Sequence, residues 1–395
     1  MPTRPCWVEI RTQALEDNYK FLAGSVAPHA ELLAIVKANA YGHGLEICGP
    51  AAMRAGARWL GVTSVEEGVA ARAACSDAEI LIISGVFQGQ GIDVVRNRLT
   101  VVVWEPWHLD ELESAARSAG AGVGSVRVHL EVDTGMSRQG IDLNSIGPLL
   151  KRFDQASPLR LDGVMTHLFA ADEADGVVTE EQLMRLESAL GPVKGAGLQP
   201  AWLNVGNSAA LLGGRAEEIG ALAAKFGLRA MIRPGLALYG LAPEFDPTFE
   251  KDEPASLRAA RAQLRPVLAW KTKVVSVRAV AAGTVIGYNG TFVATEPMKL
   301  ALLAVGYGDG LDRKLGNRFS LLVRGQRAPL VGRVSMDQAV IDVTEIDGVT
   351  AGDEVVILGS QGTETVSAFD HARAADTVPW EVLTRIGARV MRVRV

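Results

Sequence analysis

The chain has 395 residues, 48% hydrophobic and 22% charged, so it is long enough for two globular domains and is neither fibrous nor disordered. Its 40 Lys and Arg against 45 Asp and Glu, with no basic block, argue against nucleic acid as a partner. Cys6, Cys48 and Cys75 are too scattered for a disulfide framework or a metal cluster, and no apolar run approaches the roughly 20 residues of a membrane span. We therefore expect a cytoplasmic protein that acts on a small molecule, without metal, nucleic acid or membrane.

Short apolar runs alternate with segments of helical period over the first 240 residues. The runs that predict strands are 32–38, 59–64, 79–85, 99–104, 126–133, 161–168, 202–208 and 231–240. The segments that predict helices include 13–26, 45–55, 65–74, 106–119 and 179–190. This repetition predicts a parallel (β/α)8 TIM-like barrel over 12–245, with a doubly wound open sheet as the alternative. In a barrel, chemistry is expected at the C-terminal ends of the strands.

The first of these runs ends on Lys37, in the segment AIVKANAYGHG at 34–44. Lysine is rarely buried without a partner, and desolvation lowers its pKa and frees its amine, as a Schiff-base lysine requires. A lone lysine at a strand end could equally extend its ammonium group into solvent. The remaining motifs must decide between these two interpretations.

The fifth candidate strand alternates strictly between apolar and polar residues. Its apolar set is Val126, Val128, Leu130 and Val132, and its polar set is Arg127, His129, Glu131 and Asp133. In a barrel covered by helices, the apolar set should face outward and the polar set inward, where each polar group needs a partner. The alternative is an edge strand of an open sheet with its charged face in water.

Polar residues also follow the last three candidate strands. His167 ends the sixth, Asn207 and Ser208 follow the seventh and open a predicted helix, and Arg233 precedes Gly235 in the eighth. The loops after strands seven and eight are the usual phosphate site of a barrel, and a serine at a helix start either caps the helix or binds phosphate. A strand-end lysine, a phosphate cradle and an inward arginine together suggest pyridoxal phosphate held as a Schiff base.

A second domain is expected over 246–395. Residues 241–266 are rich in proline and charge and predict a linker. Strands are predicted at 268–280, 298–306, 319–323, 339–343 and 353–358, with helical period at 368–386. This domain should be mainly β, and the strand within 1–11 could join either domain.

Eight motifs in order resemble the alanine racemase family of barrel-type pyridoxal phosphate enzymes, over nearly the whole chain. They are VKANAYGHG at 36–44, DTGMSR at 133–138, TH at 166–167, NSAA at 207–210, RPG at 233–235 with YG at 239–240, GYNGTF at 287–292, GYGDG at 306–310 and GRVSMDQ at 332–338. Any one of them could arise by chance, but the ordered set is highly specific.

The resemblance implies a function and a set of site residues. Lys37 would hold the cofactor and exchange the α-proton on one face of the substrate, and Tyr288 from a partner subunit would serve the other face. His167 and Arg233 would form a cationic relay toward Tyr288, with Arg233 facing the pyridine nitrogen. The implied cofactor ligands are Lys37, Tyr41, Arg138, His167, Asn207, Ser208, Arg233, Gly235, Leu236 and Trp380. The implied substrate-binding residues are Arg138, Met336, Asp337 and Tyr307.

Two positions depart from the family pattern. Many members carry a carbamylated lysine where this chain has Glu131, which supplies a negative charge without modification and is expected to hold Arg138. Trp380 stands where the family usually has a tyrosine; its indole offers only an N–H donor and more bulk, so it either alters the pocket or simply packs the C-terminal segment.

The resulting prediction is a homodimeric isomerase that interconverts L-alanine and D-alanine. The alternatives are a racemase of serine or of a longer amino acid, a pyridoxal phosphate protein without turnover, and a barrel decarboxylase. The second domain with Tyr288 argues against the binding protein, and Arg233 argues against a decarboxylase, which would usually place an acid at the pyridine nitrogen. A role in wall-precursor synthesis and one in catabolism both stay open.

Overall fold

The computed structural model describes residues 4–173, 175–245 and 254–395. The chain folds into two compact units, of which one comprises Gln13–Ala40 and Cys48–Arg265. The other comprises Met1–Thr12, Tyr41–Ile47 and Pro266–Val395. The N-terminal strand thus groups with the C-terminal residues, and so does the segment Tyr41–Ile47, which the sequence pattern assigns to the barrel.

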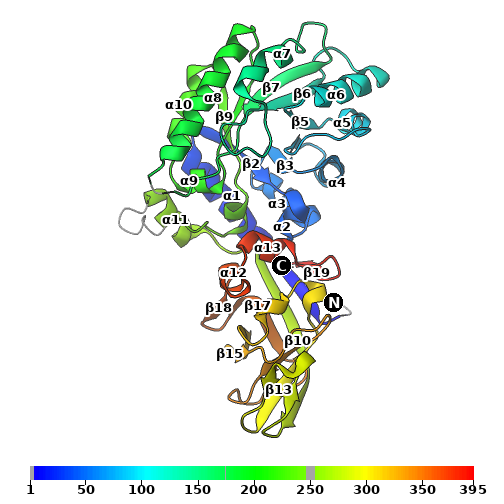
Figure 1. Ribbon diagram of the computed structural model, residues 1–395, viewed down its shortest axis with the longest axis vertical. Helices are drawn as coiled ribbons and strands as arrows, with labels where there is room; N and C mark the ends of the chain where they lie inside the picture. Colours follow the sequence, from blue (N-terminus) through cyan, green and yellow to red (C-terminus); the bar gives the residue numbers. More distant parts are fainter. Residues whose placement is uncertain (1–3, 174, 246–253) are drawn as a thin grey trace. The chain divides into compact units, whose positions relative to one another are not determined.

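The first unit is a closed barrel of parallel strands, built in the described residues from β2 to β9 in chain order (Figure 1). The strands are β2 (Ala30–Ile35), β3 (Trp59–Val62), β4 (Glu79–Ile82), β5 (Thr100–Val103), β6 (Val126–Glu131), β7 (Leu159–Met165), β8 (Trp202–Asn204) and β9 (Arg229–Ile232). The barrel closes where β2 pairs with β9, with Leu32 opposite Ile232. The predicted barrel is confirmed, and the open-sheet alternative is wrong.

Each barrel strand stops short of the C-terminal limit that the apolar pattern predicts. The clearest case is the predicted strand 231–240, where β9 ends at Ile232 and the apolar residues Leu236–Tyr239 form a 3₁₀ turn, η2. Burial explains why these residues are apolar although they make no sheet hydrogen bonds. The segments beyond the strand ends are the ones that carry the candidate site.

The helices of this unit include the five expected from periodicity and several short ones that were not. The expected helices are α1 (Thr12–Val26), α3 (Leu45–Arg54), α4 (Val65–Ala74), α6 (Pro106–Ser118) and α8 (Val177–Gly195). Helix α9 (Ser208–Leu212) begins where a helix was predicted after the seventh strand, whereas α5 (Gly91–Arg96), α7 (Ile146–Leu150), α10 (Ala216–Lys225) and α11 (Ala255–Gln263) were not expected. Helix α11 lies within 241–266, so the prediction of a linker without helix is wrong for this part of the chain. Residues 246–253 of the predicted linker lie outside the described residues.

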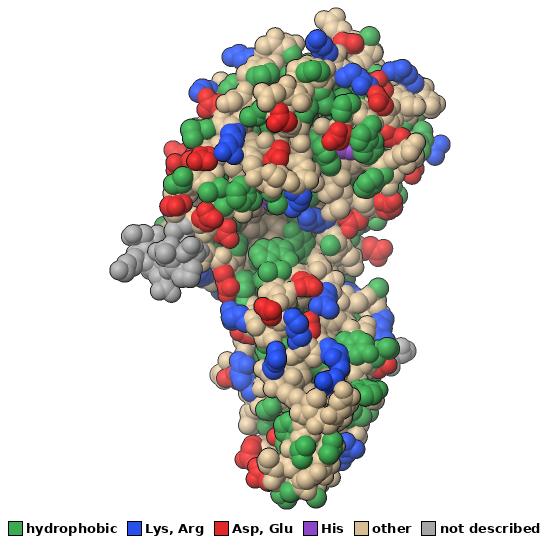
Figure 2. Space-filling view, viewed as in Figure 1, with side chains coloured by type: hydrophobic (Ala, Val, Ile, Leu, Met, Phe, Trp, Pro, Cys, Tyr) green, Lys and Arg blue, Asp and Glu red, His purple; other side chains and the backbone are tan. Residues whose placement is uncertain are grey.

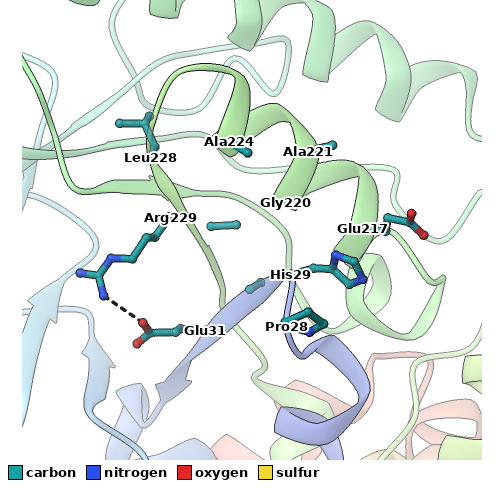
Figure 3. A pocket seen from close by; sticks show the side chains of 11 residues that line it. Pro28, His29, Glu31, Glu217, Gly220, Ala221, Ala224, Leu228 and Arg229 are labelled. Atoms are coloured by element: carbon teal, nitrogen blue, oxygen red, sulfur yellow. Dashed lines mark hydrogen bonds and ion pairs between the residues drawn. The ribbon is translucent and has the colours of Figure 1, made fainter.

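The N-terminal end of the barrel is held by charged and aromatic side chains. Glu31 forms an ion pair with Arg229 at 3.1 Å, and Arg229 stacks over Trp202 with its guanidinium carbon 3.8 Å from the ring centre. A hollow of about 480 Å³ lies here, between α10 and the starts of β2 and β9 (Figure 3). It is at the opposite end of β2 from Lys37, where residues of a barrel serve stability rather than chemistry.

The second unit is built on a large sheet. In the described residues the sheet contains β1 (Cys6–Ile10), β10 (Leu268–Val280), β13 (Met298–Leu303), β14 (Ser320–Val323), β15 (Gln326–Pro329), β16 (Ala339–Asp342), β17 (Glu354–Gln361), β18 (Glu364–Val366) and β19 (Met391–Arg394). β1 runs antiparallel to β10, with Val8 opposite Trp270, and parallel to β19, with Val8 opposite Arg392. Helices α12 (Ala368–Ala375) and α13 (Pro379–Thr384) lie in the chain between β18 and β19.

On the face of the barrel unit drawn in Figure 2, acidic and basic side chains are interspersed. This face therefore presents no continuous basic stripe, in its described residues, of the kind that follows a phosphate backbone. In the part of the chain that the structure describes, no helix combines the length and the apolar character needed to cross a membrane.

Candidate active site

The barrel brings the polar residues that follow its strands to one end. They are Lys37 after β2, Glu131 at the end of β6, His167 after β7, Asn207 and Ser208 after β8, and Arg233 after β9. Because the strands are parallel and the barrel is closed, these C-terminal ends form one ring, where the active sites of such barrels lie. The structure thus assembles the predicted barrel residues from segments spread over about 200 positions.

Lys37 opens an unusual turn. Ala38, Asn39 and Ala40 have φ and ψ near +50°, and Tyr41 has a φ of 52°, so four successive residues are left-handed and none is glycine. A left-handed turn costs about 1–2 kcal/mol per residue for L-amino acids. The surrounding structure must impose this conformation, because the local sequence does not favour it.

Backbone contacts hold the strand end immediately before Lys37. The Tyr239 hydroxyl donates to the carbonyl of Ile35 at 2.8 Å, and the Val36 N–H donates to the carbonyl of Gly61 at 2.8 Å. Tyr239 is fully buried. Burial lowers the pKa of Lys37, and the charges of Arg138 and Arg233 lower it further. This amine is therefore deprotonated more readily than a lysine in water.

Arg233 is buried and donates hydrogen bonds from both terminal nitrogens of its guanidinium. One terminal nitrogen donates to the side-chain and main-chain oxygens of Asn204 at 2.6 and 2.9 Å. The other donates to the carbonyl of Thr166 at 2.9 Å and to Nδ1 of His167 at 3.1 Å. Burial lowers the pKa of Arg233 to about 10, so it remains a cation at neutral pH. Among the described residues, no acceptor pairs with its Nε–H.

His167 is held on both its ring and its backbone. Because Arg233 can only donate, Nδ1 of His167 must accept, which leaves the ring proton on Nε2. Gln182 of α8 donates to the His167 carbonyl at 2.9 Å. Burial lowers the pKa of His167 to about 3, helped by the charges of Arg233, Arg138 and Lys37. His167 is therefore neutral at pH 7, and the positive charge of the expected relay resides on Arg233.

The start of α9 meets the segment after β9. Asn207 caps the helix by accepting from the Ala210 N–H at 3.0 Å. The Ser208 hydroxyl oxygen accepts from the N–H groups of Gly235 and Ala237, at 3.0 and 3.2 Å. Ser208, Gly235 and Leu236 are all buried. A hydroxyl and several backbone amides therefore converge here, as a phosphate site requires.

Glu131 is buried, and its hydrogen-bond partner differs from the expected one. Gln139 donates from Nε2 to the Glu131 carboxylate at 2.6 Å and to the carbonyl of Ile83 at 3.1 Å, so it bridges the ends of β6 and β4. Arg138 is exposed and forms no ion pair among the described residues. Burial raises the pKa of Glu131 to about 6, against the lowering effects of Gln139, Arg233 and Arg138. Glu131 acts on Arg138 through charge and not through a direct bond.

The polar face of β6 continues into the barrel interior. Arg127 pairs with Glu79 of β4 and lies 5.6 Å from the ring centre of Trp59 on β3. His129 lies 3.4 Å from the side-chain nitrogen of Asn204 on β8. These partners come from strands that do not neighbour β6, so the polar set faces inward as expected. An edge strand with its charged face in water is excluded.

The remaining predicted residues lie in the second unit, where most are exposed. Tyr288 is 66% exposed and lies in a 3₁₀ turn between β11 (Val285–Ile286) and β12 (Phe292–Val293). Gly287 before it has a φ of 75°, which favours glycine. Trp380, in the first turn of α13, is 38% exposed. Tyr41, by contrast, is buried, and burial raises its pKa to about 12.

Two motifs of the second unit are joined by their backbones. The N–H groups of Tyr307 and Gly308 donate to the carbonyls of Ser335 and Met336, at 3.0 and 2.9 Å. A Cβ at Gly306 would lie 2.3 Å from the Ser335 carbonyl oxygen, so only glycine fits there. Tyr307 and Met336 are thus presented together, with their side chains 42% and 54% exposed.

An ionic cluster beneath these motifs was not predicted from the sequence. Asp309 is fully buried and pairs with Arg4 and Arg389, and Arg389 also binds Asp337 at 2.8 Å. Gln139 and Asn204 in the barrel were likewise not predicted from the sequence. Gln139 directly follows the motif at 133–138, and Asn204 lies three residues before the motif at 207–210. The acidic residue between glycines in the motif at 306–310 was the available sequence signal for Asp309, whereas Arg4 and Arg389 carry no local signal.

Comparison with known proteins agrees with this arrangement. The alanine racemase N-terminal domain model matches residues 10–243, and the C-terminal domain model matches 267–394. A curated alanine racemase from Symbiobacterium thermophilum is 38% identical over 390 residues, 98% of this chain and 97% of that protein.

Solved structures agree as well. The alanine racemase from D-cycloserine-producing Streptomyces lavendulae superposes with a TM-score of 0.88 at 34% identity, over 100% of this chain and 98% of that chain. The alanine racemase from Bartonella henselae with covalently bound pyridoxal phosphate gives a TM-score of 0.81 at 26% identity, over 99% of each chain. The chain therefore belongs to the alanine racemase family.

Proposed function

We propose that the chain is a pyridoxal-phosphate-dependent racemase that interconverts L-alanine and D-alanine. The observation that carries the proposal is the ring of Lys37, His167 and Arg233 at one end of the barrel, where a lysine of lowered pKa accompanies a buried arginine. The curated relatives named alanine racemase support alanine as the substrate.

The donor set of the barrel fits pyridoxal phosphate. Lys37 offers an amine that deprotonates readily, and Ser208 with the amides of Gly235 and Leu236 would hold the phosphate, together with Tyr41 and the α9 start at Asn207. The relative from Bartonella henselae, which carries the cofactor covalently, supports this choice. When bound, pyridoxal phosphate supplies an electron sink for the negative charge left at the substrate α-carbon.

Arg233 would meet the pyridine nitrogen through the one N–H that its other hydrogen bonds leave over. A guanidinium donates and cannot supply an acidic proton near neutral pH, so the ring nitrogen would stay unprotonated. An unprotonated ring nitrogen would make the cofactor a weaker electron sink and would limit side reactions such as transamination. Asn204, Thr166 and His167 hold Arg233 in this orientation with four hydrogen bonds.

Racemisation needs an acid–base group on each face of the α-carbon. Lys37 would take or return the proton on one face, since its lowered pKa leaves the amine free to accept it. Tyr288 of a partner subunit would serve the other face. Tyrosine is a weak base at its ordinary pKa near ~10, so it needs a cation close by, and His167 would relay the charge of Arg233 to it.

Arg138 would meet the substrate carboxylate, and Glu131 would balance the cationic site. Lys37, Arg138 and Arg233 bring three potential positive charges together, and Glu131 is a buried acid whose pKa both arginines lower. Glutamate needs no carbamylation for this purpose. Its bond to Gln139 at 2.6 Å keeps the carboxylate in place.

We further propose a homodimer in which the second unit of each subunit completes the site of the other. The exposed, largely apolar side chains of Tyr288, Tyr307, Met336 and Trp380 support such a covered surface. Asp337 would join them across the interface. The cytoplasm is the proposed compartment, because the thiols of Cys6, Cys48 and Cys75 are unpaired.

A substrate panel tests the proposal. Purified protein loaded with pyridoxal phosphate is incubated with L-alanine, L-serine or L-lysine, and the D-enantiomer is detected. We expect D-alanine to form fastest. Faster D-serine or D-lysine formation would reassign the substrate, and no D-product from any of them would contradict a racemase. Trp380→Tyr serves as the matched variant, because it restores the usual family residue and reports whether Trp380 affects selectivity.

A further inference from the structure

The turn that follows Lys37 is held by a side chain from a different strand–helix unit. Glu67 lies in the first turn of α4, and its own N–H donates to the cap residue Ser64 at 3.3 Å. Its Oε1 accepts from the Ala38 N–H at 2.6 Å, and its Oε2 accepts from the Thr63 N–H at 2.8 Å. One carboxylate therefore bridges the chain just after β2 and the chain just after β3.

The first of these bonds is made by the residue next to Lys37. Ala38, Asn39 and Ala40 are left-handed, a conformation that L-residues adopt only when their surroundings impose it. The Ala38 N–H points to Glu67 at the first residue of that turn. Glu67 is thus placed to set the direction in which the chain, and with it Lys37, leaves the strand.

Glu67 also balances the charge around Lys37. Arg138 and Arg233 lower the pKa of Lys37 beyond the effect of burial, whereas the negative charge of Glu67 raises it. The carboxylate therefore has two effects on Lys37, one on its backbone and one on its protonation.

We propose that Glu67 is a positioning residue for Lys37: its carboxylate clamps the left-handed turn at Ala38 to the end of β3 and moderates the charge at the Lys37 amine. The part that concerns the amine rests on the function proposed for Lys37. The clamp on the backbone does not depend on that function and can be measured separately.

Side-chain chemistry makes Glu67 hard to replace. Two N–H donors need two acceptor oxygens, and glutamine offers one oxygen together with an NH₂ group that would face an N–H. Aspartate keeps the charge but is one methylene shorter, so it can reach only one of the two amides. Glu67→Gln therefore removes the negative charge and one hydrogen bond, whereas Glu67→Asp keeps the charge and removes one hydrogen bond.

Glu66 provides the matched control. It is the adjacent residue of the same helical turn, carries the same charge and accepts from Gln90 at 2.9 Å, away from the Lys37 turn. Glu66→Gln should therefore behave like the parent protein. Circular dichroism and melting temperature establish that all three variants fold.

The first measurement is peptide-level hydrogen exchange over 36–40 in the full chain. We expect Glu67→Gln to exchange about tenfold faster or more there, as loss of a hydrogen bond to a charged acceptor implies, with Glu66→Gln unchanged. Exchange within twofold of the control would overturn the clamp. This result stands whether or not the protein loads a cofactor.

The second measurement uses protein loaded with pyridoxal phosphate. Borohydride trapping followed by mass analysis locates the cofactor on Lys37, and the pH dependence of its absorbance reports the charge nearby. We expect Glu67→Gln to move the midpoint of this pH dependence to lower pH, because the negative charge that raises the pKa of Lys37 is removed. We also expect kcat to fall by about tenfold, with KM changed less, because a hydrogen bond to a charged acceptor is lost. Glu67→Asp should lower kcat while keeping the midpoint.

The outcomes separate the two claims. Absence of trapping on Lys37 in the parent protein would contradict the proposed function, and the hydrogen-exchange result would still decide the clamp. Trapping in the parent with an unchanged midpoint and kcat in Glu67→Gln would overturn the positioning role and leave the proposed function intact.

Discussion

The guanidinium of Arg233 donates a hydrogen bond of 3.1 Å to Nδ1 of His167, and this bond determines the state of both groups. His167 must carry its proton on Nε2 and stays neutral, with a pKa of about 3, while Arg233 keeps the charge. The pair therefore presents a neutral imidazole N–H backed by a buried cation.

Replacing Arg233 should affect stability and the imidazole together. Arg233→Met leaves the buried side-chain oxygen of Asn204 and the carbonyl of Thr166 without their donor, so we expect the free energy of unfolding to fall by about 3 kcal/mol or more. The pKa of His167 should rise, because a neighbouring positive charge is removed. Denaturant unfolding and nitrogen chemical shifts of the imidazole measure the two effects. Arg215→Met, which removes surface ion pairs with Glu180 and Glu218, should change stability by less than about 0.5 kcal/mol.

The buried histidines predict a stability that falls in mild acid. Burial lowers the pKa of His129 to about 3 and of His108 and His371 to about 4, against about 6.5 when unfolded. Between pH 6.5 and 4 the unfolded chain binds more protons, so the free energy of unfolding should decrease as pH falls through this window. Glu131, whose pKa is raised to about 6, acts in the opposite direction as a single group.

Unfolding by urea at several pH values checks this dependence. Each histidine contributes up to about 1.4 kcal/mol per pH unit within its window. His371→Gln should flatten the curve, because it removes one group that binds its proton at a higher pH in the unfolded chain than in the folded one. A free energy of unfolding that is constant or rises between pH 6.5 and 4.5 would contradict the neutral buried state of these histidines.

Gln139 should control the acidic limb of activity through Glu131. Its hydrogen bond lowers the pKa of Glu131, so Gln139→Leu should raise that pKa above the present value of about 6. Activity that needs the Glu131 carboxylate should then fall at a higher pH than in the parent. Rates of D-alanine formation from pH 5 to 9 report the shift. Gln13→Leu, which removes a surface bond to Asp17, is the matched control, and equal profiles for both variants would contradict the role of Gln139.

Sharing of the site between subunits predicts complementation. Lys37→Ala and Tyr288→Phe should each be inactive as homodimers. In a mixed dimer, one site lacks both groups and the other retains both, so random mixing should restore about a quarter of parental activity. Activity that stays absent after subunit exchange, verified by mass analysis of mixed dimers, would contradict a site built from two subunits.

The barrel was predictable because its strands repeat a simple pattern, but the ends of the strands were not. Leu236 and Tyr239 are as apolar as strand residues, although they form a buried 3₁₀ turn, so composition alone extended the last strand too far. Parallel strands buried on both faces give no alternation that marks where they end.

The site was predictable where a motif carries its own chemistry, as at Lys37 and Arg233. Partners distant in sequence were not: Gln139 reaches back to Ile83, and Arg389 reaches Asp309, and neither pairing leaves a local trace. The hydrogen bond of Glu131 to Gln139 instead of Arg138 likewise depends on how far each side chain reaches in the folded protein, which the sequence does not show.

The most direct test of the two-base racemase is exchange of the α-proton of alanine with deuterated water. Parent protein loaded with pyridoxal phosphate should convert L-alanine to D-alanine and replace the α-proton with deuterium, as followed by proton NMR. Tyr288→Phe removes one acid–base group, so D-alanine formation should fall by at least about 100-fold. Racemisation and deuterium incorporation that are unchanged in Tyr288→Phe would contradict the account.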